Sequence, residues 1–509
     1  MKNTKLWVAG AFVFLSTACS VTPEAFDDDT VAQILANDRA AVLAGAAPVT
    51  SSISIDEAVA RALKYNLDMR TKLFEQSLAA AELEAGKFDM LPKLMANAGY
   101  FWRNNENVRF SANSESPDTF TNDTPFISTE REHIGRDATL SWSLLDFGAS
   151  YYTAKQNADR VIVASERRRK AMHTLIQNVR SAYWRALAAE ALGERVNQTI
   201  RQAEDALEMS RAMSDERVRS PDEALRYQRN LLENLRLLEA VEREVINSRV
   251  SLANLMGLMP GAEFTLVEPD TTPTKIAVGL TELEAIALMR NTDLREKMLD
   301  VRIAANDTRK AILKLLPGLS FDYGVRKDDD YYLKNQEWRD ASVRVSYNLF
   351  SLLSAPAIKR AAKKNEALAE ARRIALQMTV LSQVHLTYYS YHEALQQFSR
   401  ADDIFSVDSQ LAALAASQTQ SATAGSLREI SASVTSILSL VRRYQAMAKV
   451  NEAAGQLQAS LGLEPNIPSL DDASVAQLTN RVAKWSSTGM GLENLPLQAP
   501  ELFLNEASE

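Results

Sequence analysis

Two kinds of periodicity alternate along the chain and predict long helices separated by pairs of strands. Apolar residues recur at helical spacing on charged stretches, for example from Met172 to Leu187 and from Leu427 to Tyr444. Narrow apolar stripes of this kind are typical of antiparallel coiled-coil packing. No proline lies between Pro125 and Pro221 or between Pro356 and Pro465. The segment 149–213 alone would extend roughly 100 Å at 1.5 Å per helical residue.

Four other segments alternate with period two, so that each has one apolar and one polar face. They cover residues 94–102, 138–144, 321–325 and 341–349. The two longest, at about nine residues each, have nearly the length of tilted membrane strands, although a half-buried sheet in a soluble domain would show the same alternation. Membrane strands are favoured because the sequence offers no other apolar cluster for them to cover. The residues predicted to face lipid are Leu140, Trp142, Val343, Val345 and Tyr347.

The order of these elements occurs twice, so we divide the chain into a first repeat (51–260), a connector (261–280), a second repeat (281–465) and a C-terminal tail (466–509). The matched positions are Ile55-Asp56-Glu57-Ala58-Val59 with Leu283-Glu284-Ala285-Ile286, Asn66-Leu67 with Asp293-Leu294, Leu91-Pro92 with Leu316-Pro317, Tyr183 with Tyr388, and Gly257 with Gly462. A duplication of this kind determines the overall architecture, so it is established before individual helices and strands are assigned. The spacing shortens between the prolines and the tyrosines, which places a longer insertion, Asn104 to Glu132, in the first repeat. Its polar composition predicts an extracellular loop.

The N-terminus predicts export. Residues 1–18 resemble a signal peptide, because the apolar run Leu6 to Leu15 is about half of the ~20 residues that a spanning helix needs. The motif Ser16-Thr17-Ala18-Cys19 fits cleavage before a cysteine that then takes lipid, which makes Cys19 the candidate lipidation site. An ordinary signal peptidase could cut the same bond. Residues 19–50 are then predicted to form a lipid-anchored arm with a short amphipathic helix.

Composition argues against several functional classes. The net charge of −8 disfavours a general nucleic-acid binder, and the single cysteine cannot form an internal disulfide. The four histidines show no metal-ligand spacing, and no phosphate-binding glycine loop is present. We therefore expect no enzyme activity, no cofactor and no metal. Asp328-Asp329-Asp330 is predicted to be a solvated turn, with cation binding as the alternative.

Two motifs identify a family. A Leu-Pro pair precedes the first strand of each repeat, and Trp142-Ser143-Leu144-Leu145-Asp146-Phe147-Gly148 follows the second strand. Together with the duplicated helix–strand–strand–helix–helix unit, over about residues 50–465, they resemble the TolC family of outer-membrane efflux channels. The family motif is roughly Pro-Leu-Phe-Asp-x-Gly. Here Ser143 replaces the proline, and Asn348-Leu349-Phe350-Ser351 in the second repeat lacks the acid and the glycine.

The resemblance implies a mainly α fold with membrane β strands. Four strands cannot close a barrel, since lipid tolerates no open sheet edge and closed bacterial barrels need about eight strands. The family forms homotrimers with a 12-stranded barrel in outer-membrane lipid of a Gram-negative bacterium and a long periplasmic α-helical tunnel. This implies a passive exit duct for tripartite efflux or type I secretion. Its implied partners are a periplasmic adaptor and an inner-membrane pump of RND, ABC or MFS type. A periplasmic coiled-coil scaffold or adaptor without a pore is the alternative.

Helix-cap chemistry predicts where the far end of the tunnel lies. Ser220-Pro221-Asp222-Glu223 and Ser426-Leu427-Arg428-Glu429 each place Ser three residues before Glu, which is a capping box. The family places such hairpins at the periplasmic tip, where the adaptor binds. This marks Ser220, Pro221, Glu223, Gly425 and Ser426 as tip residues, and Glu429 as a candidate pore gate. Alternatively, Glu429 only caps its helix.

Overall fold

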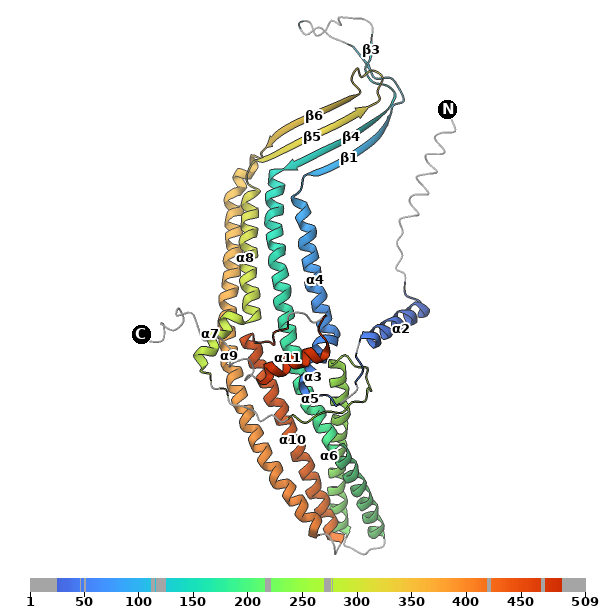
Figure 1. The fold of residues 1–509 in the computed structure, drawn as a ribbon, viewed down its shortest axis with the longest axis vertical. Coiled ribbons are helices and arrows are strands. Elements are labelled where there is room, and N and C mark those ends of the chain that lie inside the picture. Colours follow the sequence, from blue (N-terminus) through green and yellow to red (C-terminus); the bar gives the residue numbers. More distant parts are fainter. Residues whose placement is uncertain are drawn as a thin grey trace, which may run out of the picture.

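The computed structural model shows an elongated molecule in which a strand sheet stands at one end of long helices (Figure 1). The residues that it describes are 25–45, 47–49, 52–110, 115, 125–215, 221–269, 276, 278–418, 423–467 and 472–487. The predicted signal peptide, Cys19 and Ser220 lie outside the described residues.

Both repeats contain the same elements in the same order. The first repeat consists of α3 (Ile55–Tyr65), α4 (Leu67–Lys87), β1 (Lys93–Trp102), β4 (Glu132–Ser143), α5 (Leu144–Asp215) and α6 (Pro221–Leu255). The second consists of α7 (Leu280–Arg290), α8 (Thr292–Leu313), β5 (Gly318–Asp328), β6 (Glu337–Ser346), α9 (Phe350–Gln418) and α10 (Thr423–Leu461). The first repeat adds a short 3-10 helix, η1 (Phe88–Met90), and a small ribbon of β2 (Val108–Arg109) and β3 (Phe126–Ile127). The predicted mainly α fold with four long strands is confirmed.

The first residues of α4 and α8 correct the predicted alignment of the two repeats. Asn66 caps α4 by accepting a hydrogen bond from the Met69 N–H at 3.0 Å, and Asn291 caps α8 by accepting one from the Leu294 N–H at 3.0 Å. Asn291, rather than Asp293, is therefore the counterpart of Asn66. The predicted match is wrong by two positions because Asn and Asp both suit the start of a helix. The short helices that precede these caps, α3 and α7, correspond over their full lengths of 11 residues.

Each repeat ends against its own beginning. Gly257 and Gly462 have positive φ angles of 70° and 67°, a conformation that side-chain-bearing residues rarely adopt. A Cβ atom at Gly257 would lie 2.7 Å from the Tyr65 carbonyl oxygen, and one at Gly462 would lie 2.2 Å from that of Arg290. Only glycine therefore permits the close approach that brings the end of the last helix onto the end of the first.

The four long strands form one antiparallel sheet in the order β1-β4-β5-β6. Strand β6 ends at Ser346, so Tyr347 and Leu349, which the alternation placed in the strand, lie beyond it. The reason is local, because the Asn348 side chain accepts a hydrogen bond from the Phe350 N–H at 3.1 Å and turns the chain into α9.

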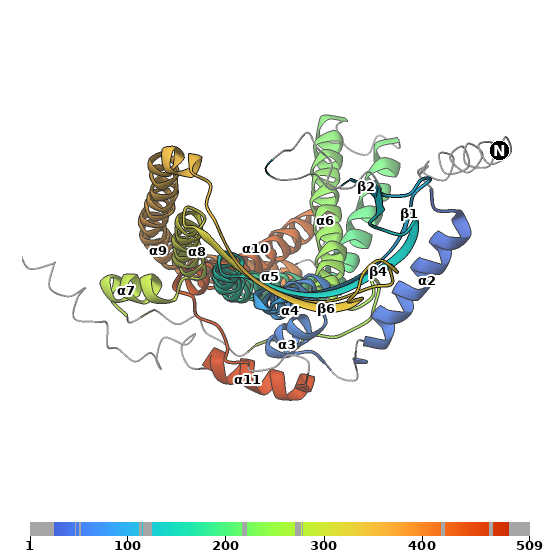
Figure 2. The ribbon, with the colours of Figure 1, turned by 90° about the horizontal axis from the view of Figure 1, so that it is seen from above.

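Below the sheet, α4, α5, α8 and α9 lie side by side in that order, since the contacting pairs are α4 with α5, α5 with α8, and α8 with α9. Farther down, α5 pairs with α6 and α10, and α10 pairs with α9. Viewed from above, the sheet and helices trace a curved wall rather than a closed body (Figure 2). None of the helices within the described ranges combines the length and apolarity that a membrane-spanning helix requires.

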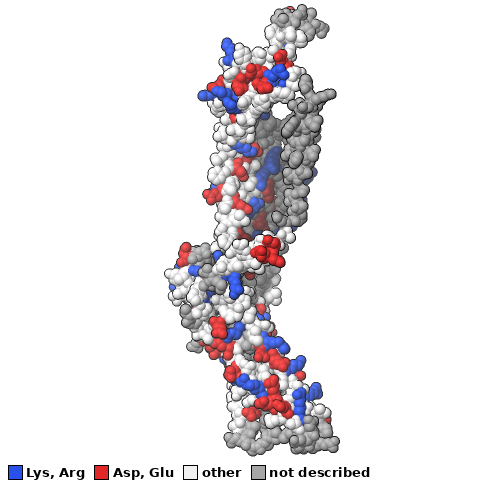
Figure 3. Space-filling view, turned by 90° about the vertical axis from the view of Figure 1, so that its right-hand side faces the viewer, with Lys and Arg blue, Asp and Glu red and all other residues white. Residues whose placement is uncertain are grey.

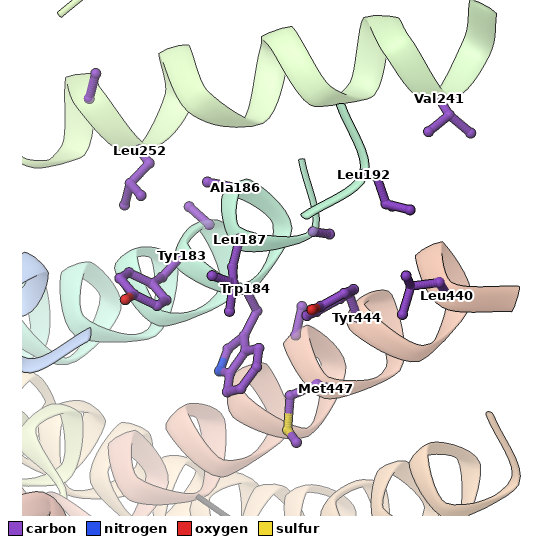
Figure 4. Close-up of a cluster of buried hydrophobic side chains, with 14 of the residues drawn as sticks. Tyr183, Trp184, Ala186, Leu187, Leu192, Val241, Leu252, Leu440, Tyr444 and Met447 are labelled. Atoms are coloured by element: carbon purple, nitrogen blue, oxygen red, sulfur yellow. The ribbon is translucent and has the colours of Figure 1, made fainter. Parts of the chain in front are cut away.

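The main core surrounds the middle of α5. Tyr183 and Trp184 are buried there, and the Trp184 ring lies 6.5 Å from that of Tyr444 on α10 (Figure 4). The Tyr183 hydroxyl lies 2.9 Å and 2.6 Å from the carbonyl oxygens of Ile53 and Val267. One side chain thus ties the chain before α3 and the connector to the central helix.

The terminal segments add a helix each. In the C-terminal tail, α11 (Val475–Ser487) packs on α3 and buries Leu478 and Val482, so this part of the tail covers the first repeat. In the N-terminal arm, α2 (Asp28–Gly45) is longer than the short helix predicted there, and its apolar side chains Val31, Ile34 and Leu35 are exposed.

Candidate membrane sheet and helical tip

Most of the apolar residues of the four strands lie on one face of the sheet. Directly paired residues in an antiparallel sheet share a face. The register places Trp142 beside Phe321, which in turn lies beside Val343, and it places Val345 beside Leu319. A second row joins Leu94, Leu140, Tyr323 and Ala341. The side chains of Val343 and Val345 are 68% and 70% exposed, so within this chain the apolar face is uncovered.

The other face of the sheet is mostly polar and internally hydrogen-bonded, although Met95, Phe101 and Trp338 also lie on it. The Asp322 carboxylate accepts hydrogen bonds from Ser141 at 2.6 Å and from Ser342 at 3.3 Å, which joins three strands. Arg326 forms an ion pair with Asp340 at 3.0 Å. A sheet with one exposed apolar face and one polar face can divide lipid from water.

The end of the sheet away from the helices is charged. His133 pairs with Asp328 at 2.9 Å, and the Asp330 carboxylate accepts hydrogen bonds from the backbone N–H groups of Glu130 and Tyr332 at 3.1 and 3.0 Å. The acidic loop therefore caps its own turn. Across the described ranges, no group of three or more His, Cys, Asp or Glu residues is arranged to hold a metal ion. Figure 3 shows charged residues gathered at this end and a largely uncharged band directly below them.

The helices flanking the wall carry exposed apolar side chains along their length. On α4 these include Leu67, Phe74 and Leu78, and on α9 they include Met378, Leu386 and Tyr389. In the sheet, β1 and β6 lie at the two edges, so each pairs on one side only within the described chain. Both sides of the wall thus present apolar surface and open strand edges.

Two helical hairpins form the opposite end of the molecule, where α5 leads to α6 and α9 leads to α10 (Figure 1). Helix α6 begins at Pro221, the first helical position predicted for it. Helix α10 begins at Thr423, so Gly425 and Ser426 lie inside its first turn. The predicted N-cap at Ser426 is wrong because Thr423 and Ala424 can extend the helix upstream. Of the tip residues, Pro221 and Glu223 thus start one helix, and Gly425 and Ser426 start another.

Glu429 lies in the second turn of α10 and is half-buried. One residue later, Ile430 is buried in the core. Ser431 and Ser433 lie 3.4 Å from Asn234 on α6 and Thr199 on α5, which fixes α10 against both helices of the first repeat. The main chain at Glu429 is thereby held, whereas the Glu429 carboxylate forms no hydrogen bond or ion pair with the described residues.

A buried ionic cluster connects the two repeats, and sequence reasoning missed it. Glu464, just beyond α10, accepts hydrogen bonds from Arg169 at 2.8 and 2.9 Å and lies 2.8 Å from His173, both on α5. Burial alone would raise the pKa of the Glu464 carboxyl, but hydrogen bonds from His173 and Arg169 outweigh burial and hold this pKa below its usual range. The only sequence signal is the basic run at residues 167–170, a pattern that usually lies on a solvated helix face.

Comparison with known proteins supports the same architecture. Residues 58–258 match the family model described as outer membrane efflux protein. No curated protein sequence matches the chain. Among solved structures, the chain is similar to the outer-membrane channel OprN, with 17% identity, a TM-score of 0.61, and coverage of 80% of this chain and 89% of that one.

Two further channels show the same likeness. The CmeC outer membrane channel of Campylobacter jejuni is 12% identical, with a TM-score of 0.59 and coverage of 91% of this chain and 97% of that one. The MtrE outer membrane channel of Neisseria gonorrhoeae, in its open state, is 14% identical, with a TM-score of 0.56 and coverage of 80% and 90%. The resemblance seen in the sequence is confirmed: the chain has the fold of the TolC-like outer-membrane channels, and its first repeat matches the outer membrane efflux protein family.

Proposed function

We propose that the protein is one subunit of a trimeric outer-membrane channel, which acts as the passive exit duct of a tripartite efflux or type I secretion system. The observation that carries this proposal is the four-stranded sheet, which has an exposed apolar face, a polar face and two open edges. The likeness to channel structures supports it.

Closure of the sheet requires further copies of the chain. In lipid every backbone polar group needs a partner, so the edges of β1 and β6 must pair with other strands. Pairing the β6 edge of one copy with the β1 edge of the next builds a ring, and three copies give twelve strands. The same operation brings the exposed apolar side chains of α9 against those of α4 in the next copy. One symmetric arrangement therefore covers both exposed surfaces.

The duct would take its energy and its opening signal from partners. A periplasmic adaptor would bind the helical tip, and an inner-membrane pump would drive transport. A lipid on Cys19 would tether the N-terminal arm to the membrane. Intact-mass measurement of the mature protein tests this last point, since an unmodified N-terminal Cys19 would contradict lipidation.

The apolar face provides the main test. Replacing Val345 with Lys should weaken membrane assembly by about 2–4 kcal/mol if the residue lies at mid-depth. Arg344 lies on the polar face of the same strand, so Arg344→Ser is the matched control and should assemble normally. Heat-modifiable electrophoretic migration of the membrane-embedded protein measures assembly. Equal tolerance of the two substitutions would contradict a lipid-facing sheet.

We also propose that Glu429 faces the pore at the tip. Three copies of its carboxylate around a narrow axis would attract cations, because charges in a confined pore act more strongly than in bulk water. Glu429→Lys should then reverse or abolish cation preference in single-channel recordings, and Glu429→Gln should reduce it. A purely structural Glu429 predicts unchanged selectivity in both variants.

A further inference from the structure

The start of α9 combines exposed apolar residues with a cluster of cations. Leu352 and Leu353 are exposed, the latter at 79%, and they follow directly on the end of the sheet. Two turns later the chain carries Lys359, Arg360, Lys363 and Lys364, all exposed. We call these four residues the basic collar. An apolar segment followed closely by exposed cations is the pattern of a protein surface that crosses from acyl chains into lipid headgroups.

The basic collar forms no ion pair within the described chain, and the nearest acid on α9, Glu366, follows it. No Asp or Glu occurs from Ala341 to Asn365. In the described chain, the ion pairs of α9 join His385 with Glu284 and Asp402 with Arg443, and none includes a residue of the basic collar. Four exposed cations within six residues repel one another, so this surface has a strong preference for an anionic partner.

The first repeat provides an internal comparison. At the corresponding level of α5, Lys155 lies over the Tyr151 ring at 4.7 Å from its centroid. The nearby Asp159 is a buried acid that forms an ion pair with Arg302 of α8. Lys155 thus contacts an aromatic ring of its own helix, and this level of α5 also carries an acid, whereas α9 has four clustered cations and no acid from Ala341 to Asn365.

The collar lies at the height expected of lipid headgroups. At 1.5 Å per residue, Lys359 to Lys364 lie roughly 14–21 Å along the helix from Phe350. The sheet lies directly above the top of α9 in Figure 1, and Leu349, which immediately precedes α9 in the chain, is exposed. Long Lys and Arg side chains extend several ångströms towards a headgroup layer while their stems cover apolar surface.

Two residues of the basic collar, Lys359 and Lys363, lie on a face of α9 that is turned away from α8. Leu352, Lys359 and Lys363 are spaced by seven and four residues and therefore share one face of α9. The groove towards α8 is lined by a different face, which includes Ser351, Ser354 and Ile358. The face with Leu352 and the two lysines consequently lies away from α8 and is free to meet a surface outside the chain.

We propose that the basic collar binds anionic phospholipid headgroups at the periplasmic surface of the outer membrane. This inference rests on the proposed membrane location of the sheet. Three copies of the chain would place twelve cations around the channel, which would fix its depth in the bilayer and select anionic over zwitterionic lipid. Each Lys or Arg near an anionic surface is worth about 1 kcal/mol, or roughly fivefold in affinity, before salt screening.

The test uses the purified full-length protein and two probes, phosphatidylglycerol and phosphatidylcholine. Lipids that remain bound are counted by native mass spectrometry over a lipid titration. Wild type should retain phosphatidylglycerol preferentially. Replacing all four collar residues with Gln should weaken phosphatidylglycerol binding at least tenfold and leave phosphatidylcholine unchanged, whereas replacing the three lysines with Arg should preserve the preference.

Two controls separate the collar from net charge and from assembly. Arg372→Gln with Arg373→Gln removes cations farther down the same helix, and Lys155→Gln removes the counterpart in the first repeat; both should keep wild-type lipid preference. Undiminished preference in the collar variant would overturn the proposal, as would a collar variant that loses its oligomer, since the four cations would then contact a neighbouring copy. A wild type without heat-modifiable assembly would instead overturn the proposed function, whereas an assembled wild type without lipid preference overturns only this inference.

Discussion

The long helices α5 and α9 are copies of one element, yet they occupy opposite environments. Tyr183 and Trp184 on α5 are buried, whereas their counterparts on α9, Tyr388 and Tyr389, are half-buried and 62% exposed. The difference follows from position, because α5 contacts helices on both sides while α9 lies at the edge of the wall. The same sequence pattern therefore forms a core in one repeat and, in the proposed trimer, an interface in the other.

The largest expected loss of stability comes from replacing Tyr183, and the same change at its counterpart Tyr388 should cost less. Tyr183→Ala should cost about 3–5 kcal/mol of stability, because it empties a core site and removes the hydroxyl that contacts two carbonyl groups. Tyr388→Ala should cost about 1–2 kcal/mol. Unfolding by denaturant, followed by helical circular dichroism, measures both. Equal losses would show that the two helices are equally buried in the assembled protein. Burial raises the pKa of Tyr183, so Tyr183 stays protonated at neutral pH.

The ionic cluster at Glu464 sharpens the comparison, because the counterpart of Glu464 in the first repeat is Met259. The folded pKa of Glu464 lies below its unfolded value of about 4.3, so its stabilisation is fully present above that pH and is lost as pH falls through the folded pKa. Glu464→Gln should cost about 1–3 kcal/mol at pH 7 and reduce the acid sensitivity of unfolding. Met259→Gln should leave the pH profile of unfolding unchanged. A Glu464→Gln profile parallel to wild type down to pH 3 would exclude this linkage.

The smallest expected loss of stability comes from removing a helix cap, and it should be the same in both repeats. Asn66→Ala and Asn291→Ala each remove a side-chain cap at the start of a helix, with an expected cost of about 0.5–2 kcal/mol. Each asparagine also donates to a carbonyl oxygen at the end of its own repeat, Leu255 at 3.3 Å and Ser460 at 2.9 Å. Thermal midpoints of the two variants should therefore agree closely. A clearly larger loss for one would show that the repeats differ in this joint as well as in burial.

The sequence predicted what depends on local periodicity and missed what depends on distant partners. The strand alternation predicted the apolar face that holds Trp142, Val343 and Val345, because period two is a property of neighbouring residues. The cap at Ser426 was misplaced because a helix can begin at any of several adjacent residues that tolerate it. The Tyr183 contacts could not be predicted, since their partners lie 84 and 130 positions away.

The candidate site residues, too, could be predicted only where their positions depend on neighbouring residues in the sequence. Pro221 marked the start of α6 because proline is favoured at the first helical position. Whether the Glu429 side chain faces a pore depends on how neighbouring copies pack around α10. The sequence of one chain could therefore identify Glu429 only as a candidate. The ionic role of Arg169 was hidden because a basic run on a helix has the same pattern whether its carboxylate partner is solvent-exposed or lies nearly 300 residues later.

The two glycine turns bear on how such a chain could arise. Gly257 meets Tyr65 and Gly462 meets Arg290, so each repeat starts and finishes at the same level of the molecule. A tandem gene fusion of a half-length ancestor would then need only a short link between the end of one copy and the start of the next. A ring of three such chains, each with two repeats, would be geometrically equivalent to a ring of six ancestral units. Fusion would have freed the two halves to diverge, one towards the interior and the other towards the seam between subunits.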